Sequence, residues 1–306
     1  MPETARSKNT SATDVLWRSL LYTPGHQPGL AVKAARSAAD VVILDLEDAV
    51  PPDAKELARK MILESAPVLA AGHKEIAVRI NAVCEAQDAD LAAAVGAGAD
   101  IIILPKIESA GQVRAIANRL SGIEASGKET ALIALIETPK GLHDAGAIAL
   151  SHPRLRAINL GTEDFSREMG MDPDWDSLLF PSQQVAIAAK AAGIVPLGYA
   201  GSITEFRDID AFAKVLKKSA RLGFEGGFAI HPAQITPLNA AFSPSEADVA
   251  DAEEVVSRFR EATASGLGAV SVRGRMVDLP VAIRAEAKLR RAALCRSRDI
   301  VCDKNC

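Results

Sequence analysis

Short apolar runs, many of them rich in β-branched residues, alternate with longer Ala-rich stretches along most of the chain. Most of the short runs are continuous rather than interrupted by alternating polar residues, which is typical of parallel strands covered on both faces. Eight such runs predict strands that begin about 20 to 37 residues apart. The predicted strands cover residues 20–23, 41–46, 75–81, 101–105, 131–137, 157–161, 194–198 and 227–231.

The longer stretches, rich in Ala, Leu, Lys and Glu, predict helices between these strands. Ser109 precedes one of them and is the expected N-cap, while Gly193 and Gly223 stand where two others should end. The predicted helices cover residues 53–71, 109–125, 182–192, 205–222, 245–264 and 281–294.

Eight strand–helix units in about 230 residues predict an α/β protein whose core is one closed (β/α)8 TIM barrel. An open doubly wound sheet is the alternative, but no Gly-x-Gly-x-x-Gly follows the first strand. The chain therefore divides into a polar N-terminal tail at 1–19, a catalytic barrel at 20–242, a lid or oligomerisation arm at 243–294 and a tail at 295–306. The arm is too short for an independent domain, so we expect it to pack on the barrel or on a neighbouring subunit.

Composition narrows the function classes. The 306 residues are 48% apolar and 24% charged, which is typical of a globular protein. The net charge of −4 provides no basic surface for nucleic acid. No apolar run approaches the roughly 20 residues that a membrane span needs, and the first 19 residues lack the apolar stretch of a secretory signal. We therefore expect a cytoplasmic protein with neither a membrane nor a nucleic-acid partner.

Four cysteines are present, Cys84, Cys295, Cys302 and Cys306, and three of them lie in the last twelve residues. None belongs to a Cys-x-x-Cys pair. We expect free thiols rather than a disulfide or a metal site.

Polar side chains follow most of the predicted strands at their carboxyl ends, where active sites of such barrels lie. Glu137 and Asp164 follow neighbouring strands, and two carboxylates with water form a hard oxygen site suited to Mg²⁺. Arg79 offers a fork for a carboxylate or carbonyl oxygen. A cation beside an arginine suits an enolate or an α-keto acid, because both stabilise negative charge on oxygen. The alternative role for any single acid at a strand end is that of a helix cap. The other polar residues at these ends are Asp45, Glu47, Asp48, Asn81, Lys106, Glu108, Glu163 and His231.

Eight motifs occur in order along the chain, the first seven at these strands and the last in the arm: LYTPG at 21–25, VILDLEDAV at 42–50, VRIN at 78–81, LPKIES at 104–109, LIET at 135–138, GTEDF at 161–165, AIHPAQ at 229–234 and GRMVDLP at 274–280. With them the sequence resembles the citrate lyase β-subunit-like branch of the HpcH/HpaI aldolase/citrate lyase family, which includes malyl-CoA and citramalyl-CoA lyases. The resemblance extends from about residue 20 to about residue 289.

This resemblance implies Mg²⁺, or Mn²⁺ in its place, held by Glu137 and Asp164, with Arg79 and Glu137 on the oxygens of the substrate. It also implies that Asp278 reaches the active site of an adjacent subunit and acts there as an acid or base. The implied assembly is a homotrimer or a dimer of trimers. Contacts to CoA or substrate are implied for Tyr22, Lys33, Glu163, Ile230 and His231.

The implied reaction is the cleavage of a 3-hydroxyacyl-CoA, of malyl-CoA or citramalyl-CoA type, to an acyl-CoA and an α-keto acid. A retro-aldol, Claisen-type step of this kind leaves a thioester enolate, which an acid must protonate, and Asp278 is the candidate. Arg79 would add a second positive charge to that of the metal. Coenzyme A enters as part of the substrate.

Several residues keep a second interpretation. Asp45, Glu47 and Asp48 are interpreted as partners of Arg79 or Lys106 rather than catalysts, and Lys106 as such a partner rather than a Schiff-base former. His231 could be a core histidine bonded to backbone, Asp278 could cap the helix that follows it, and Arg273 and Arg275 could only anchor the arm. Two further departures from the family pattern are Gln27, which replaces a usual arginine, and the loop at 199–204, interpreted as a substrate-selecting difference.

Other functions stay open at this point. The chain could be a citrate lyase β subunit acting on a citryl thioester of an acyl carrier protein, or a thioesterase acting on malyl-CoA. It could also be a Mg²⁺ or Mn²⁺ aldolase for free hydroxy-keto acids, with His26 as its base. A non-catalytic homologue is the remaining alternative, and the presence of Glu137 and Asp164 counts against it.

Overall fold

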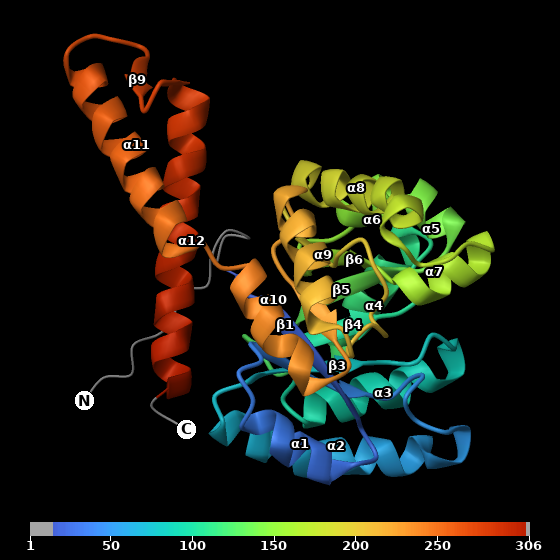
Figure 1. Ribbon diagram of the computed structural model, residues 1–306. Coiled ribbons are helices and arrows are strands. Elements are labelled where there is room, and N and C mark those ends of the chain that lie inside the picture. The colour runs from blue at the N-terminus through green and yellow to red at the C-terminus, as the bar shows by residue number, and fades with distance from the viewer. Residues whose placement is uncertain (1–14, 304–306) are drawn as a thin grey trace. The chain divides into compact units, whose positions relative to one another are not determined.

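The computed structural model describes residues 15–303 of the chain (Figure 1). Most of the predicted N-terminal tail, and Cys306, lie outside these residues. The chain divides into two compact units, one up to Phe242 and one from Ser243 onward. None of the helices between residues 15 and 303 is long and apolar enough to cross a membrane.

The first unit is a barrel, and all eight predicted strands are confirmed in the described part of the chain (Figure 1). Every neighbouring pair is parallel, in the order β7-β6-β5-β4-β3-β2-β1-β8, and a bridge between Leu197 and Gly226 links the two ends. The predicted TIM-barrel fold is therefore confirmed. The strands are β1 (Ser19–Pro24), β2 (Val41–Asp45), β3 (Glu75–Arg79), β4 (Ile101–Leu104), β5 (Ala131–Ile136), β6 (Leu155–Leu160), β7 (Val195–Leu197) and β8 (Gly227–Ala229).

The continuous apolar character of the strands follows from two separate cores. Successive side chains of a strand point to opposite faces, and β4 shows this clearly. Ile101 and Ile103 belong to a cluster built almost only from strand residues, which is the inside of the barrel. Ile102 and Leu104 belong to a second cluster that also contains helix residues such as Ile62, which is the layer between strands and helices. A strand buried on both faces has no polar face to alternate.

Helices cover the outside of the barrel (Figure 1). The predicted cap Ser109 is confirmed, since its side chain accepts a hydrogen bond from Gln112 N in a reciprocal capping box. Gly193 and Gly223 end two helices with positive φ values of 69° and 100°. The helices are α1 (Pro28–Ala35), α2 (Lys55–Ala71), α3 (Cys84–Gly96), α4 (Ala110–Ile123), α5 (Pro139–His143), α6 (Ala145–Ala149), α7 (Thr162–Met169), α8 (Trp175–Ala191), α9 (Ile209–Arg221) and α10 (Ile235–Ala241).

The sequence did not predict several of these helices. They are short or lack a clear apolar stripe, so their periodicity is weak. The most informative case is α7, which begins inside the GTEDF motif and carries Glu163 and Asp164 in its first turn. These acids face the positive end of the helix dipole, a placement that stabilises carboxylates.

The second unit is a helical hairpin joined by a small β-hairpin. Helices α11 (Glu246–Ala264) and α12 (Leu279–Asp303) flank the antiparallel strands β9 (Val270–Val272) and β10 (Arg275–Val277). The β-hairpin was not predicted. Its turn residues Arg273 and Gly274 both have positive φ, as two-residue hairpin turns require.

Helix α12 continues to Asp303, beyond the predicted end at residue 294. Val255, Val256, Val272 and Val277 are among the residues that form the small core of this unit. Cys295 is buried and Cys84 is exposed, and both are free thiols as predicted. The side chain of Cys302 lies outside the described residues.

A buried ion pair lies at the amino ends of β1 and β2, where Arg18 and Asp40 directly precede the two strands. The Arg18 guanidinium donates to both oxygens of Asp40 at 2.9 and 2.8 Å, and the Arg18 backbone N–H adds a third bond of 2.8 Å. The two side chains are 3% and 0% exposed. Both charges are thus removed from water and depend on each other.

We expect Asp40→Asn to lower the free energy of unfolding by about 3 kcal/mol, because the buried Arg18 guanidinium would lose the negative charge of the carboxylate that it contacts through two nitrogens. Urea unfolding followed by circular dichroism measures the change. Glu56→Gln is the matched control, since Glu56 pairs with Lys60 on an exposed helix face and should change stability by less than about 0.5 kcal/mol. Equal effects of the two substitutions would contradict the prediction.

Candidate active site

Arg79 and Asp45 end two neighbouring strands and form the most buried ion pair of the carboxyl rim. The register of β2 and β3 puts them opposite each other. The Arg79 Nε and Nη2 atoms donate to the two Asp45 oxygens, both at 2.7 Å. Such a two-pronged contact fixes the plane of the guanidinium as well as its position.

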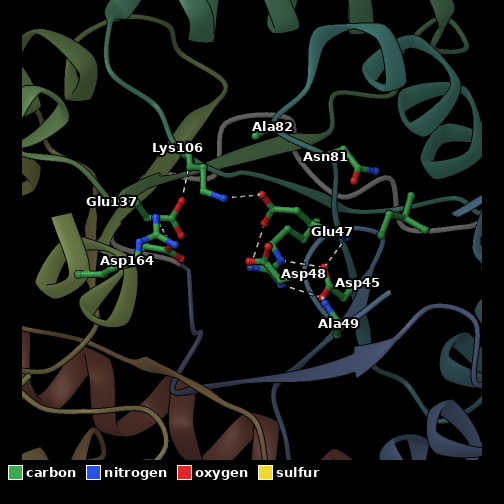
Figure 2. A network of polar contacts seen from close by, with 12 residues as sticks. Asp45, Glu47, Asp48, Ala49, Asn81, Ala82, Lys106, Glu137 and Asp164 are labelled. Atoms are coloured by element: carbon green, nitrogen blue, oxygen red, sulfur yellow. Dashed lines mark hydrogen bonds and ion pairs between the residues drawn. The ribbon is translucent and has the colours of Figure 1, made fainter. Parts of the chain in front are cut away.

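Asp45 also holds the loop that follows β2. Its carboxylate accepts hydrogen bonds from the backbone N–H groups of Glu47 and Ala49, at 2.9 and 3.0 Å. Lys55 supports the same loop from α2, because its ammonium donates to the Leu46 carbonyl at 2.7 Å. The loop thereby presents its own carboxylates at a fixed place, and Figure 2 shows Asp45, Glu47 and Asp48 gathered there.

The remaining nitrogen of the guanidinium faces this loop. Arg79 Nη1 lies 3.1 Å from Glu47 and 3.2 Å from Asp48. The Tyr22 ring lies under the guanidinium, 4.7 Å from its carbon to the ring centroid, and stacks on Phe228. The interpretation of Asp45, Glu47 and Asp48 as partners of Arg79 agrees with these contacts.

Glu137 follows β5 and is 4% exposed. The backbone N–H of Lys106 donates to its Oε2 at 2.7 Å, and Lys106 has a left-handed φ of 51°. Gly161 provides the space for this carboxylate. A Cβ atom at Gly161 would lie 2.4 Å from Glu137 Cγ and 2.8 Å from Oε1.

Asp164 lies beside Glu137, and Figure 2 shows both carboxylates on the same side of Lys106. Burial raises the pKa of Glu137 to about 7, and the negative charge of Asp164 adds to this rise. The Lys106 hydrogen bond and the charges of Arg79 and Lys106 act in the opposite direction. An exposed arginine, Arg167, lies 2.9 Å from the other side of Asp164.

Lys106 separates these two carboxylates from the group around Glu47 (Figure 2). Its ammonium lies 3.4 Å from Glu47 Oε1, which agrees with the prediction that Lys106 is a partner of acids. Burial raises the pKa of Glu47 to about 8, since Asp48 and Glu137 reinforce the shift and Arg79 and Lys106 only partly offset it. The rim therefore holds two carboxyl groups, Glu47 and Glu137, whose charged form burial disfavours more than the nearby cations favour it.

The residues at this rim fit a Mg²⁺ ion. Glu137 and Asp164 supply hard oxygen donors, and Mg²⁺ is usually held by one or two carboxylates while it keeps several waters. Within residues 15–303 there is no group of three or more His, Cys, Asp and Glu side chains that could hold a metal by protein ligands alone. Because Gly161 has no side chain, the Glu137 side chain can occupy the space at the rim that a Cβ atom would fill.

The other residues expected to contact substrate lie on three segments. Lys33 is exposed on α1. Glu163 is half-buried and accepts a hydrogen bond from the Ser202 hydroxyl at 2.6 Å. Ile230 and His231 follow β8 and are both exposed, so the alternative of a core histidine is wrong. The His231 ring accepts from Ala233 N at 3.2 Å and stacks on Phe206.

Asp278 belongs to the second unit. Its carboxylate accepts a hydrogen bond from Val281 N at 3.2 Å and so caps α12, as one of the two interpretations predicted. Arg275 pairs with Asp251 at 2.6 Å, and Arg273 pairs with Glu254. Both arginines therefore anchor the β-hairpin to α11.

Sequence reasoning missed the supporting role of several residues. Lys55 and Gln234 act through backbone groups, Gly161 through the space it leaves, and Ser202 through the Glu163 carboxylate. Gly161 and Gln234 stand inside recognised motifs, which was the only available signal for them. Lys55 and Ser202 carried no such signal.

Comparison with known proteins assigns the family. Residues 18–232 match the model of the HpcH/HpaI aldolase/citrate lyase family, and the chain belongs to this family. It is an enzyme of the aldolase and lyase class, as predicted.

Three relatives illustrate the similarity. An L-malyl-CoA/beta-methylmalyl-CoA lyase of Rhodobacter capsulatus is 34% identical, covering 91% of this chain and 95% of the relative. The citrate lyase subunit beta of Escherichia coli (strain K12) is 36% identical, with coverage of 92% and 95%. The crystal structure of CitE from Mycobacterium tuberculosis in complex with magnesium, acetoacetate and coenzyme A has a TM-score of 0.74 and 31% identity, covering 92% of this chain and 99% of that one.

We expect Gly161→Ala to lower the free energy of unfolding by about 1–3 kcal/mol, because the new methyl group would overlap the buried Glu137 side chain. Urea unfolding measures this change. Gly122→Ala is the control, since nothing lies within 4 Å of a Cβ at this exposed position of α4, and it should raise stability by about 0.5–1 kcal/mol. A Gly161→Ala protein as stable as the wild type would show that Glu137 is not confined by this backbone.

Proposed function

We propose that this chain is a Mg²⁺-dependent carbon–carbon lyase that cleaves a 3-hydroxyacyl-CoA of malyl-CoA or citramalyl-CoA type to an acyl-CoA and an α-keto acid. The observation that carries the proposal is the buried Glu137 carboxylate beside Asp164, on the rim where Asp45 holds the Arg79 guanidinium. The names of the malyl-CoA lyase relatives and the magnesium and coenzyme A of the CitE complex support the substrate class.

Glu137 and Asp164 would hold the metal, and Mn²⁺ would suit the same oxygen donors. When bound, the cation supplies Lewis-acid stabilisation of negative charge on the substrate oxygens. Arg79 supplies a second positive charge. Its guanidinium need not move during the reaction, since Asp45 and Tyr22 already fix its position. Arg79 would hold the carboxylate or the developing carbonyl of the keto-acid half.

The reaction breaks the bond between the hydroxyl-bearing carbon and the thioester α-carbon. The hydroxyl would pass its proton to the Asp278 carboxylate and become the keto group, while the electron pair of the broken bond passes to the thioester as its enolate. An acid then protonates the enolate carbon to give the acyl-CoA. We assign this proton to Asp278 of an adjacent subunit, and with it an assembly as a homotrimer or a dimer of trimers.

The remaining contacts follow the residue chemistry. The exposed Lys33 ammonium suits a phosphate group of CoA, and Tyr22, Glu163, Ile230 and His231 would line the substrate around the rim. The cytoplasmic location that the composition predicts is part of the same proposal.

A second candidate is a citrate lyase β subunit acting on a citryl thioester of an acyl carrier protein. The 36% identity to the Escherichia coli citrate lyase subunit favours it. Substrate tests with free CoA esters separate the two candidates.

Incubation of the purified protein with Mg²⁺ and malyl-, methylmalyl- or citramalyl-CoA should release acetyl- or propionyl-CoA together with a keto acid, as followed by mass spectrometry. EDTA should abolish the release and added Mg²⁺ should restore it. Release of free CoA with intact hydroxy acid would instead indicate a thioesterase. Turnover of none of the esters would contradict the proposal and favour an acyl-carrier substrate.

Asp164→Asn should weaken Mg²⁺ binding by about 100-fold or more and lower kcat/KM by a similar factor, since one of two carboxylate ligands loses its charge. Calorimetry measures the binding. Glu168→Gln, which removes an exposed carboxylate from the same helix, is the control and should bind like the wild type.

The wild-type affinity for Mg²⁺ should fall about tenfold for each pH unit below 7 and level off above it, because the proton on Glu137 (pKa about 7) must leave before the metal binds. A pH-independent affinity would contradict the role of Glu137.

Mixing two inactive variants tests the role of Asp278. If Asp278 serves a neighbouring subunit, Asp278→Asn and Asp164→Asn chains refolded or co-expressed in equal amounts should form some intact sites. Random head-to-tail assembly should restore about one quarter of the wild-type kcat. Mixtures without any recovered activity, at an oligomeric state confirmed by light scattering, would place Asp278 in its own subunit's site or outside catalysis.

A further inference from the structure

The side-chain amide of Gln234 joins the loop after β8 to the loop after β7. Gln234 is fully buried. Its Oε1 accepts from the backbone N–H groups of Ile230 and His231, at 2.9 and 3.1 Å, and its Nε2 donates to the Ile203 carbonyl at 2.9 Å. Two donors thus meet one end of the side chain and an acceptor meets the other, which is the pattern an amide satisfies.

A second set of contacts joins the loop after β7 to α7, the helix that carries Asp164. The Ser202 hydroxyl donates to Glu163 Oε1 at 2.6 Å and accepts from Thr204 N at 3.1 Å. Glu163 precedes Asp164 in the first turn of α7. The β7 loop is therefore tied on one side to the helix of the proposed metal ligand and on the other side to Ile230 and His231.

The loop after β7 is packed against the core on one side and borders a cavity on the other. A cavity of about 470 Å³ borders it, with Trp175, Phe212 and Ser202 among the residues of its wall. The Phe206 ring stacks on His231 with the ring centroids 4.9 Å apart, which is a further contact between the two loops. Tyr199 and Ala200 belong to the buried core at the start of the loop, and on the side of the cavity the hydrogen bonds of Gln234 and Ser202 add fixed points to this packing.

We propose that Gln234 is a positioning residue for substrate recognition, which with Ser202 holds the loops after β6, β7 and β8 as one wall of the acyl-CoA site. This inference rests on the proposed function, because it takes Ile230, His231 and Glu163 as contacts of the CoA ester. On the opposite side of the rim, Arg79 is held by ion pairs with Asp45 and Glu47, and neither of these carboxylates belongs to this wall. Loss of Gln234 should therefore weaken substrate binding while the metal site and the chemical step remain.

Gln234→Met keeps the length of the side chain and removes all three hydrogen bonds. We expect the KM for the CoA ester, and the Kd for coenzyme A measured by calorimetry, to rise about tenfold. The kcat should stay within about threefold of wild type, and the Kd for Mg²⁺ should be unchanged. Gln184→Met is the matched control, since Gln184 on α8 donates one similar bond to the Leu142 carbonyl at 3.1 Å, away from these loops.

Two further variants keep the test decisive if Gln234→Met does not fold. Ser202→Ala breaks the link to Glu163, together with the local bonds of Ser202 to Thr204, and leaves the Gln234 bonds in place. It should raise the coenzyme A Kd in the same direction by about threefold. Gln234→Glu can replace the donor to Ile203 only while its carboxyl is protonated. Its KM relative to wild type should therefore be near one at low pH and increase as pH rises.

The outcomes separate the two hypotheses. A wild type that cleaves the ester, with unchanged KM and coenzyme A Kd in the Gln234 and Ser202 variants, would overturn this inference alone. A fall in thermal stability no different from that of Gln184→Met, without any change in KM, would leave Gln234 a structural residue only. A wild type that neither binds coenzyme A nor cleaves any ester would overturn the proposed function and this inference with it.

Discussion

The two-pronged contact between Asp45 and Arg79 is the interaction on which this rim of the barrel depends. Asp45 is fully buried and accepts bonds from Arg79, Glu47 N and Ala49 N, so one carboxylate fixes both the guanidinium and the following loop. A buried ion pair contributes little net stability, because desolvation offsets most of the attraction. What it provides here is a positive charge at a fixed position, which is the condition for stabilising charge that develops on a substrate.

The same rim brings several carboxyl groups together in a buried place, where their charged forms are disfavoured. The raised pKa values of Glu47 and Glu137, about 8 and about 7, both result from burial and from neighbouring carboxylates. Structures usually avoid such clusters, and perturbed carboxylates in one place are typical of functional sites. The left-handed backbone of Lys106 is also typical of a functional site, since this strained residue directs its N–H to Glu137. A divalent cation held by Glu137 and Asp164 would favour the charged form of both carboxyl groups, which Lys106 and Arg79 alone do not restore for Glu137.

The sequence predicted the barrel because strands such as β2 and β4 are buried on both faces and read as unbroken apolar runs. It predicted the rim because parallel strands bring their carboxyl ends together, so Arg79 and Glu137 had to converge. The start of α7, the turn at Arg273 and the backbone of Lys106 could not be predicted. The Lys106 backbone is tied to Glu137, which lies far away in the sequence, and local periodicity does not encode such a contact. The start of α7 has no side-chain cap to mark it. The turn at Arg273 is local, but strands of three residues are too short to give a clear pattern.

The two sides of the rim are held by different kinds of bond, and this difference bears on how such a site can change its substrate. Around Arg79 the contacts are ion pairs, where a change of one partner leaves a buried charge unbalanced. Around Gln234 they are neutral hydrogen bonds to backbone groups, which cost less to rearrange, while the Ser202 hydroxyl donates to the Glu163 carboxylate. On the function proposed here, chemistry common to the family would reside on the charged side. The loop at 199–204 could then vary with the acyl-CoA without disturbing the charges that break the carbon–carbon bond.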